Sequence, residues 1–142
     1  MITSSGQYGK CVTEKLSPLF WYVTSCLYDC IVISTLKKVT IGASVKTIYD
    51  KAFYNCSSVT AYSVESGNTA YKAVDGILYT FDGRTLVQYP IGRKDTAFTV
   101  PNSVTVIGNG AFAFSNLKTV TLQQGVECIE EDAFAYSISL GN

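Results

Sequence analysis

The sequence predicts a mainly β fold, a solenoid of short stacked strands with one inserted β-hairpin. An Ala-Phe pair recurs in similar surroundings, apolar positions repeat at a constant offset, and one unit carries additional β-prone residues around a turn. A length of 142 residues is that of one domain, and a composition with 47% hydrophobic and 15% charged residues excludes a disordered chain.

The Ala-Phe pair stands in KAFYN (51–55), GAFAF (110–114) and DAFAY (132–136). Aligning Phe112 with Phe134 sets an offset of 22 residues, under which apolar residues meet apolar residues. An earlier segment matches the last unit at an offset of 81, where seven apolar residues meet apolar partners. These seven are Leu36, Val39, Ile41, Val45, Ile48, Ala52 and Phe53. Such an internal period is typical of repeat proteins.

Within one unit, the apolar residues first follow the period of a strand and then break it. Val39 and Ile41 alternate with Thr40, as in a strand with one buried face. The next apolar pair, Val45 and Ile48, is spaced by three, so no single strand or helix points all of these side chains inward. The chain must turn corners, and a coil that stacks on copies of itself satisfies this pattern.

The Ala-Phe pair suits the interior of such a stack. Alanine fits where backbones crowd together, and phenylalanine fills the centre of the coil. We therefore expect Phe53, Phe112 and Phe134 to form one shared buried column.

Two β-prone runs, 77–81 and 86–89, flank the turn-forming residues 82–85 and predict a hairpin. Such an insertion protrudes from one face of a stack. Its aromatic residues and a neighbouring tyrosine either form an exposed binding patch or pack the hairpin onto its neighbours. These residues are Tyr71, Tyr79, Phe81 and Tyr89.

Three segments resemble units of the BspA-like leucine-rich repeat family, whose repeat reads L-x-x-h-x-h-P-x-x-V-x-x-I-G-x-x-A-F-x-x-C, with h an aliphatic residue. The segments are LKKVTIGASVKTIYDKAFYNCSSV, FTVPNSVTVIGNGAFAFSNL and LKTVTLQQGVECIEEDAFAYSISL. NTAYKAVDGILYTFDGRTLVQYP, residues 68–90, is similar to a longer variant repeat with an inserted hairpin. The resemblance covers about residues 35–142 and implies a right-handed leucine-rich-repeat solenoid.

This sequence departs from the family pattern at four turn positions. Gly42 and Gln123 replace the usual proline, and Tyr49 and Glu130 replace the usual glycine. The departures concern the details of the turns and leave the expected fold unchanged.

The expected repeat units cover about 35–57, 58–94 with the hairpin, 95–115 and 116–138, followed by the start of a further unit. Residues 1–34 do not follow the repeat and form a cap, a signal or anchor, or a degenerate repeat. The apolar run 19–28 is interrupted by Asp29, and no small-residue cleavage site is evident.

At the C-terminal end, Ile138 and Leu140 stand where the next unit would begin. The last strand is then open to pairing. The pattern indicates a fragment, a chain that associates with itself through this edge, or an array completed by another protein.

Composition argues against several functions. Lys and Arg number 11, as do Asp and Glu, and no basic cluster occurs, so nucleic acid is not an expected partner. The chain lacks histidine, which removes Ser-His-Asp and Cys-His arrangements. The sequence has no paired C-x-x-C motif, so zinc is not indicated. We expect no catalytic residue, metal or cofactor, and therefore no enzyme.

The five cysteines leave at least one thiol free or paired between chains. Cys56 occupies the repeat's own cysteine position, where a small buried residue is usual, and Cys128 replaces Thr47 and Val106 of the sister units.

The resemblance implies a non-catalytic protein-interaction module at the cell surface or outside the cell, associated with adhesion to host or matrix macromolecules. The alternative is a structural spacer without a ligand of its own. The polar residues Lys37, Thr40, Thr119 and Thr121 lie on the repeated strands and join the aromatic residues of the hairpin as candidates for the binding surface.

Overall fold

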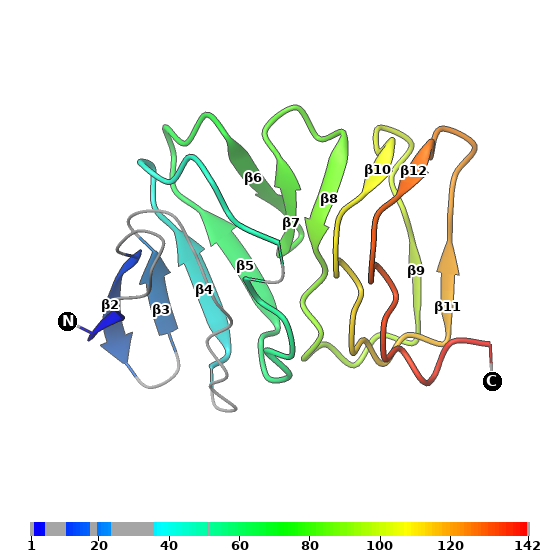
Figure 1. The fold of residues 1–142 in the computed structure, drawn as a ribbon, viewed down its shortest axis with the longest axis horizontal. Coiled ribbons are helices and arrows are strands. Elements are labelled where there is room, and N and C mark those ends of the chain that lie inside the picture. Colours follow the sequence, from blue (N-terminus) through cyan, green and yellow to red (C-terminus); the bar gives the residue numbers. More distant parts are fainter. Residues whose placement is uncertain (1, 5–10, 18–19, 24–35, 51, 142) are drawn as a thin grey trace.

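The computed structural model describes residues 2–4, 11–17, 20–23, 36–50 and 52–141 (Figure 1). Within these ranges the chain forms twelve strands and no helix, so the prediction of a mainly β fold is confirmed. The strands are β1 (Ile2–Ser4), β2 (Cys11–Ser17), β3 (Phe20–Val23), β4 (Lys38–Ile41), β5 (Ala61–Val64), β6 (Tyr71–Val74), β7 (Ile77–Thr80), β8 (Thr85–Gln88), β9 (Ala97–Thr99), β10 (Val106–Ile107), β11 (Thr119–Thr121) and β12 (Cys128–Ile129).

The strands form three sheets whose orders are β1-β2-β3-β4-β5, β12-β10-β8-β7-β6 and β11-β9. Figure 1 shows the first two sheets in succession along the long axis, with β9 and β11 alongside β10 and β12 and the two ends of the chain at opposite ends of the molecule. Pairing is parallel from β3 through β5, from β8 through β10 to β12, and between β9 and β11. Parallel neighbours require the chain to return to the same end between strands, as repeated coils do.

The register of the parallel pairs follows the sequence period. Phe98 lies opposite Val120 in β9 and β11, and Ile107 lies opposite Ile129 in β10 and β12. In both pairs the two partners are 22 residues apart in sequence, the same offset that aligns Phe112 with Phe134. Residues at equivalent places in successive units therefore lie next to each other, as a repeat fold requires.

The turns keep the same hydrogen bonds although their sequences differ. The N–H groups of Val45, Val104 and Val126 donate to the carbonyl groups three residues earlier, at N···O distances of 3.2, 3.0 and 3.1 Å. Those carbonyls belong to Gly42, Pro101 and Gln123. Loss of the usual proline at two of these places thus leaves the backbone turn intact.

The core consists of two clusters of buried side chains. The first contains Leu36, Val39, Ile41, Val45, Ala52, Phe53, Cys56, Val59, Tyr62 and Leu78. The second contains Ile77, Tyr79, Leu86, Tyr89, Ile91, Val100, Val104, Ile107, Ala111, Phe112, Leu117 and Ala133. Strand β7 divides them, because Leu78 points into the first cluster and its two neighbours point into the second.

The aromatic column in the second cluster contains Tyr89, Phe112 and Phe134. The Phe112 and Phe134 rings are parallel within 1° with centroids 5.2 Å apart, and Tyr89 stacks on Phe112 at 5.5 Å. Phe53 instead packs on Tyr62 in the first cluster, with ring centroids 4.9 Å apart. The expectation of one column shared by all three phenylalanines is therefore wrong for Phe53, because β7 separates its cluster from the second.

Strands β6, β7 and β8 pair antiparallel in succession. The turn between β7 and β8 is closed by Asp82, whose Oδ1 accepts hydrogen bonds from Thr80 Oγ1 (2.6 Å) and Arg84 N (3.0 Å). Both hydrogen bonds lower the pKa of the Asp82 carboxyl, and the bond from the Thr80 hydroxyl has the larger effect. Gly83 supplies the positive φ of 77° that the turn needs.

At the N-terminal end, β1 pairs antiparallel with β2 and β2 with β3, whereas β3 pairs parallel with β4. Most of the predicted apolar run 19–28 lies outside the described residues, which include only 20–23 of it. None of the residues that the structure describes forms a helix with the length and hydrophobicity that a membrane span requires.

Candidate interaction surface

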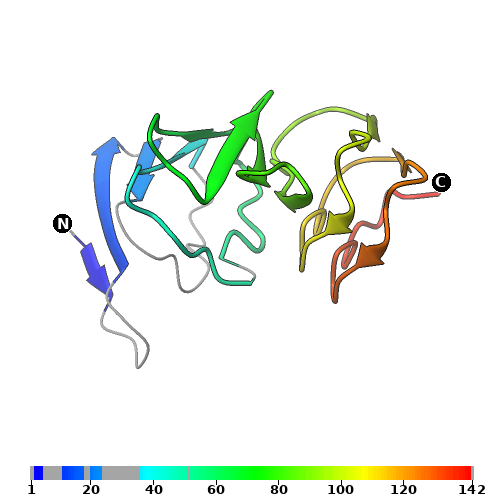
Figure 2. The same ribbon diagram turned by 90° about the horizontal axis from the view of Figure 1, so that it is seen from above.

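The sheet formed by β9 and β11 presents one row of small side chains to solvent. Phe98 and Val120 are half-buried and pack against the second core cluster. The residues on either side of them, two on each strand, are exposed. These are Ala97, Thr99, Thr119 and Thr121. Figure 2 shows β9 and β11 along one side of the last repeats, with β10 and β12 along the other.

Strands β4 and β5 carry a similar arrangement at the equivalent place in the first repeats. Thr40 and Ser63 lie opposite each other, and their hydroxyl oxygens are 2.8 Å apart in a hydrogen bond. Lys37 is exposed just before β4, and its carbonyl accepts a hydrogen bond from Thr60 N at 2.9 Å. We call Thr40, Ser63, Thr99, Thr119 and Thr121 the hydroxyl ladder.

The structure places the predicted residues Lys37, Thr119 and Thr121 on the surface and leaves Thr40 half-buried. Sequence reasoning missed two members of the hydroxyl ladder, Ser63 and Thr99. Their signal was available, because each alternates with an apolar residue in a short strand.

The four predicted aromatic residues do not form one exposed patch. Tyr79 and Tyr89 are 4% and 2% exposed and belong to the core, as the packing alternative expects. Tyr71 is half-buried, and its hydroxyl oxygen accepts a hydrogen bond from Ile48 N at 2.7 Å. Phe81, with 56% of its surface exposed, is the member that faces solvent. Phe81 lies just beyond the end of β7, in the turn to β8, so it does not share the buried position of Tyr79.

Burial also sets the chemistry of the two core tyrosines. Burial, with a smaller contribution from the charge of Asp75, raises the pKa of Tyr79 to about 12. Tyr89 donates its hydroxyl hydrogen to Asp95 Oδ2 at 2.8 Å, and burial followed by this hydrogen bond raises its pKa as well. Arg93 holds Asp95 at 3.2 Å and Asp75 at 3.4 Å. Both phenols are therefore neutral under physiological conditions.

A second aromatic group, which the sequence analysis did not single out, consists of Tyr54, Phe114 and Tyr136. The Phe114 and Tyr136 rings stack at 4.7 Å, and Tyr54 meets Phe114 edge to face at 4.9 Å. Phe114 and Tyr136 have φ angles of 61° and 56°, a left-handed conformation that costs roughly 1–2 kcal/mol for a residue with a side chain. Both occupy the same place after the Ala-Phe pair, which is the signal that could have found them.

Several large apolar side chains are exposed at the end of the molecule that carries β12. Leu122 and Ile129 are 39% and 49% exposed, whereas the equivalent Val100 and Ile107 of the preceding repeat are fully buried. Ile138 is 85% exposed. Positions that are buried between neighbouring repeats elsewhere are therefore exposed to solvent on this face.

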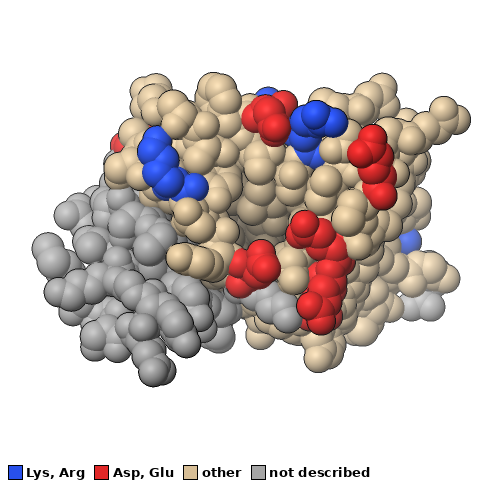
Figure 3. All heavy atoms as spheres, turned by 45° about the horizontal axis from the view of Figure 1, so that its top comes forward, with Lys and Arg blue, Asp and Glu red and all other residues tan. Residues whose placement is uncertain are grey.

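Charged side chains do not dominate the surface. Figure 3 shows Lys and Arg in small separate groups on the face that it presents, with most of that face neither basic nor acidic. In the described ranges, no group of three or more Asp, Glu or Cys side chains is placed to hold a metal ion. The arrangement suits contacts through hydroxyl and apolar groups more than through a charged field.

Successive similar units with parallel strands, a common turn and stacked buried side chains define a leucine-rich repeat protein. The chain belongs to the BspA-type leucine-rich repeat family. The family described as "BspA type Leucine rich repeat region (6 copies)" matches residues 22–74 and 93–142. The match begins at Tyr22, within the segment 1–34 that we did not expect to follow the repeat.

Solved structures of repeat proteins resemble the chain. A leucine-rich repeat protein from Eubacterium ventriosum is 32% identical over 70% of this chain, with a TM-score of 0.68. The pneumococcal vaccine antigen PcpA is 33% identical over 76%, with a TM-score of 0.71. A leucine-rich cell surface protein from Faecalibacterium prausnitzii is 23% identical over 82% of this chain and 44% of its own, with a TM-score of 0.51, and shows the fold alone.

The chain spans 27% of the length of each of the first two of these proteins. No curated protein is significantly similar to it.

Proposed function

We propose that this chain is a non-catalytic protein-interaction module of a cell-surface protein that adheres to host or matrix macromolecules. In this proposal the repeats form a right-handed solenoid, with β7 and β8 as an inserted hairpin. The observation that carries the proposal is the exposed row of side chains on β9 and β11. The two strands are hydrogen-bonded to each other, and their other faces are half-buried against the second core cluster.

A row of this kind suits binding of an extended macromolecular surface. Threonine hydroxyls both donate and accept hydrogen bonds. The opposed Thr99 and Thr121 lie at strand spacing on β9 and β11, so a partner that follows these strands adds several weak contacts. The backbone hydrogen bonds between the strands keep these side chains in place, which reduces the entropy lost on binding.

The surface location is supported by the relatives. One of them is described as a pneumococcal vaccine antigen. Carrying their location to this chain is an inference by analogy from the shared family.

We further propose that the units divide at about 35–57, 58–94, 95–115 and 116–138, and that residues 1–34 act as a cap on the first unit. The antiparallel pairing of β1 and β2, joined through β3 to the parallel strand β4, supports this role. Antiparallel strands at an end close the stack without continuing its period.

The apolar face beyond β12 supports self-association through that edge. Leu122, Ile129 and Ile138 expose the surface that a neighbouring repeat would cover. Sedimentation at increasing concentration should detect a dimer or larger species. A monomer that persists at high concentration would remove this part of the proposal.

The experiment for the binding function uses a panel of immobilised extracellular-matrix proteins. A triple variant, Thr99→Lys with Thr119→Glu and Thr121→Glu, changes the exposed row while giving the opposed pair at 99 and 121 opposite charges. We expect binding of at least one panel member by the natural chain and a loss of about 10-fold or more in the variant, roughly 1.4 kcal/mol.

The matched control changes three exposed residues elsewhere, Asn102→Glu, Asn116→Glu and Gln124→Glu. Circular dichroism must show that both variants keep the β fold. Binding that is unaffected by the triple variant, or no binding at all, contradicts the proposal and favours the structural spacer.

A further inference from the structure

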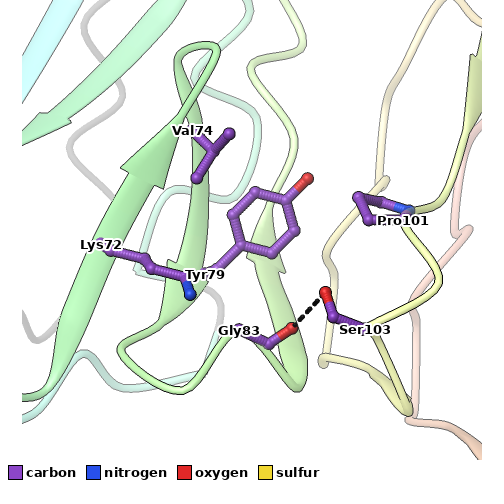
Figure 4. A pocket seen from close by; sticks show the side chains of 6 residues that line it. All are labelled: Lys72, Val74, Tyr79, Gly83, Pro101 and Ser103. Atoms are coloured by element: carbon purple, nitrogen blue, oxygen red, sulfur yellow. Dashed lines mark hydrogen bonds between the residues drawn. The ribbon is translucent and has the colours of Figure 1, made fainter.

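A small cavity lies between the antiparallel strands β6 and β7 and the first turn of the next repeat (Figure 4). Its volume is about 120 Å³. The lining residues are Lys72, Val74, Tyr79, Gly83, Pro101 and Ser103. We call it the Lys72 pocket.

Strand pairing places one charged and one aromatic wall together. Lys72 of β6 lies directly opposite Tyr79 of β7, so both side chains point to the same face of the pair. Val74 follows Lys72 by two residues and shares that face. Figure 4 shows the Tyr79 ring between Val74 and Pro101.

The turn between β7 and β8 makes room for the ammonium group. A Cβ atom on Gly83 would lie 2.7 Å from Lys72 Nζ and 3.1 Å from its Cε, so a larger residue would displace this amine. Ser103 Oγ donates a hydrogen bond to the Gly83 carbonyl at 3.3 Å. This bond ties the turn to the next repeat and keeps the two walls of the pocket together.

Lys72 is a half-buried residue whose positive charge acts through space on the nearby Asp82 carboxylate. No described residue accepts a hydrogen bond from its Nζ or forms an ion pair with it. The neighbouring acids have other partners. Asp75 pairs with Arg93 at 3.4 Å, and Asp82 accepts hydrogen bonds from Thr80 and Arg84 in the turn.

An ammonium group without a hydrogen-bond acceptor, on a half-buried lysine, is a binding feature. Partial removal from water costs free energy that a bound anion would recover. The apolar faces of Val74 and Pro101 would cover the stem that carries such an anion. Tyr79 stays neutral, because burial raises its pKa, so its phenol adds no negative charge that would repel the anion.

We propose that the Lys72 pocket binds an acidic side chain, Glu or Asp, of a partner protein. The size favours a side chain, because about 120 Å³ is well below the roughly 300–1,000 Å³ of sites for small-molecule ligands. Charge favours a carboxylate, which would pair with Lys72 Nζ. This inference rests on the proposed function as an interaction module and names the chemistry of one contact.

The test is a nuclear magnetic resonance titration of the full chain with acetyl-Ala-Glu-Ala-amide. We expect saturable shifts of the Lys72 side chain and of the Gly83 and Ser103 amides, with millimolar affinity. The same peptide with Gln in place of Glu should produce no saturable shift. The Lys72→Gln variant should weaken binding by about 10-fold or more, because a charge-assisted hydrogen bond is lost.

Lys94→Gln is the matched control, since Lys94 is exposed and lies outside the pocket. Equal shifts with the Glu and Gln peptides, unchanged binding by Lys72→Gln, or no shift at all would overturn the proposal. Acetate that binds at least as tightly as the Glu peptide would overturn the assignment to a protein side chain. The titration needs no matrix protein, so its result is independent of the panel experiment above.

Discussion

The rings of Tyr54 and Phe114 meet edge to face, with centroids 4.9 Å apart and planes at 82°. Tyr54 follows Phe53 of the first core cluster, and Phe114 packs against the second. Their contact crosses the unit that contains β6, β7 and β8. It is a direct side-chain link between two halves of the protein whose cores are otherwise separated by β7.

This link should appear as a coupling energy. We expect a double-mutant cycle with Tyr54→Ala and Phe114→Ala to give about 0.5–1.5 kcal/mol, measured as free energies of unfolding in urea. A cycle that combines Tyr54→Ala with Phe81→Ala is the control, because Phe81 is exposed on another part of the chain. Additive effects in the first cycle would show that the aromatic contact does not join the two halves.

Asn68 should be essential for the junction between the first two repeats. Its buried side chain donates to the carbonyls of Gly42 (2.9 Å) and Val45 (3.0 Å) and accepts from the N–H groups of Ala70 and Tyr71, both at 2.8 Å. We expect Asn68→Ala to lower the free energy of unfolding by about 3 kcal/mol, because it leaves buried backbone groups unpaired.

The control for Asn68 is Asn116→Ala at an exposed position, where a change within about 0.5 kcal/mol is expected. Both values come from urea unfolding curves with equal slopes. A loss at Asn68 no larger than at Asn116 would mean that water replaces the missing side chain.

Stability should fall at alkaline pH because of the buried tyrosines. The pKa of Tyr79 is raised to about 12 from an ordinary value near 10, so the folded state retains this proton while the unfolded state loses it. The stabilising contribution is complete below pH of about 10 and is lost as pH rises toward 12. Urea unfolding across that range should show the decline.

Tyr79→Phe lacks the phenol and should show a shallower decline, while the difference in slope should vanish toward neutral pH. Identical slopes for the two proteins above pH of about 10 would contradict the burial of Tyr79.

The thiols of Cys56 and Cys128 should differ in accessibility. Cys56 is buried in the first core cluster, and Cys128 is exposed on β12. Alkylation of the folded protein, mapped by mass spectrometry, should modify Cys128 well before Cys56. In denaturant the difference should disappear. Early modification of Cys56 in the folded chain would show that the first cluster opens readily.

Much of the architecture could be predicted from apolar spacing. The offset between the two Ala-Phe units reappears as the register of β9 with β11 and of β10 with β12, because equivalent residues in stacked coils must lie side by side. The common turns also followed, although Gly42 and Gln123 replace proline, since a backbone hydrogen bond does not depend on one side chain.

The candidate surface was predictable only in part. Thr119 and Thr121 were recognisable as outward positions from strand alternation. Tyr79 and Tyr89 were not assignable to surface or core, because aromatic residues suit both. The Lys72 pocket escaped sequence reasoning because its walls come from three separate segments of the chain.

The β-rich character of the chain and the residues that repeat along it follow from the linear order of amino acids, because period and polarity are properties of that order. Only the tertiary structure decided that β7 splits the core, that Phe53 leaves the column of Phe112 and Phe134, and that Tyr54 reaches Phe114. These outcomes depend on where the segment that contains β6, β7 and β8 returns to the parallel strands that follow it. Long-range packing sets that path, and no local pattern encodes it.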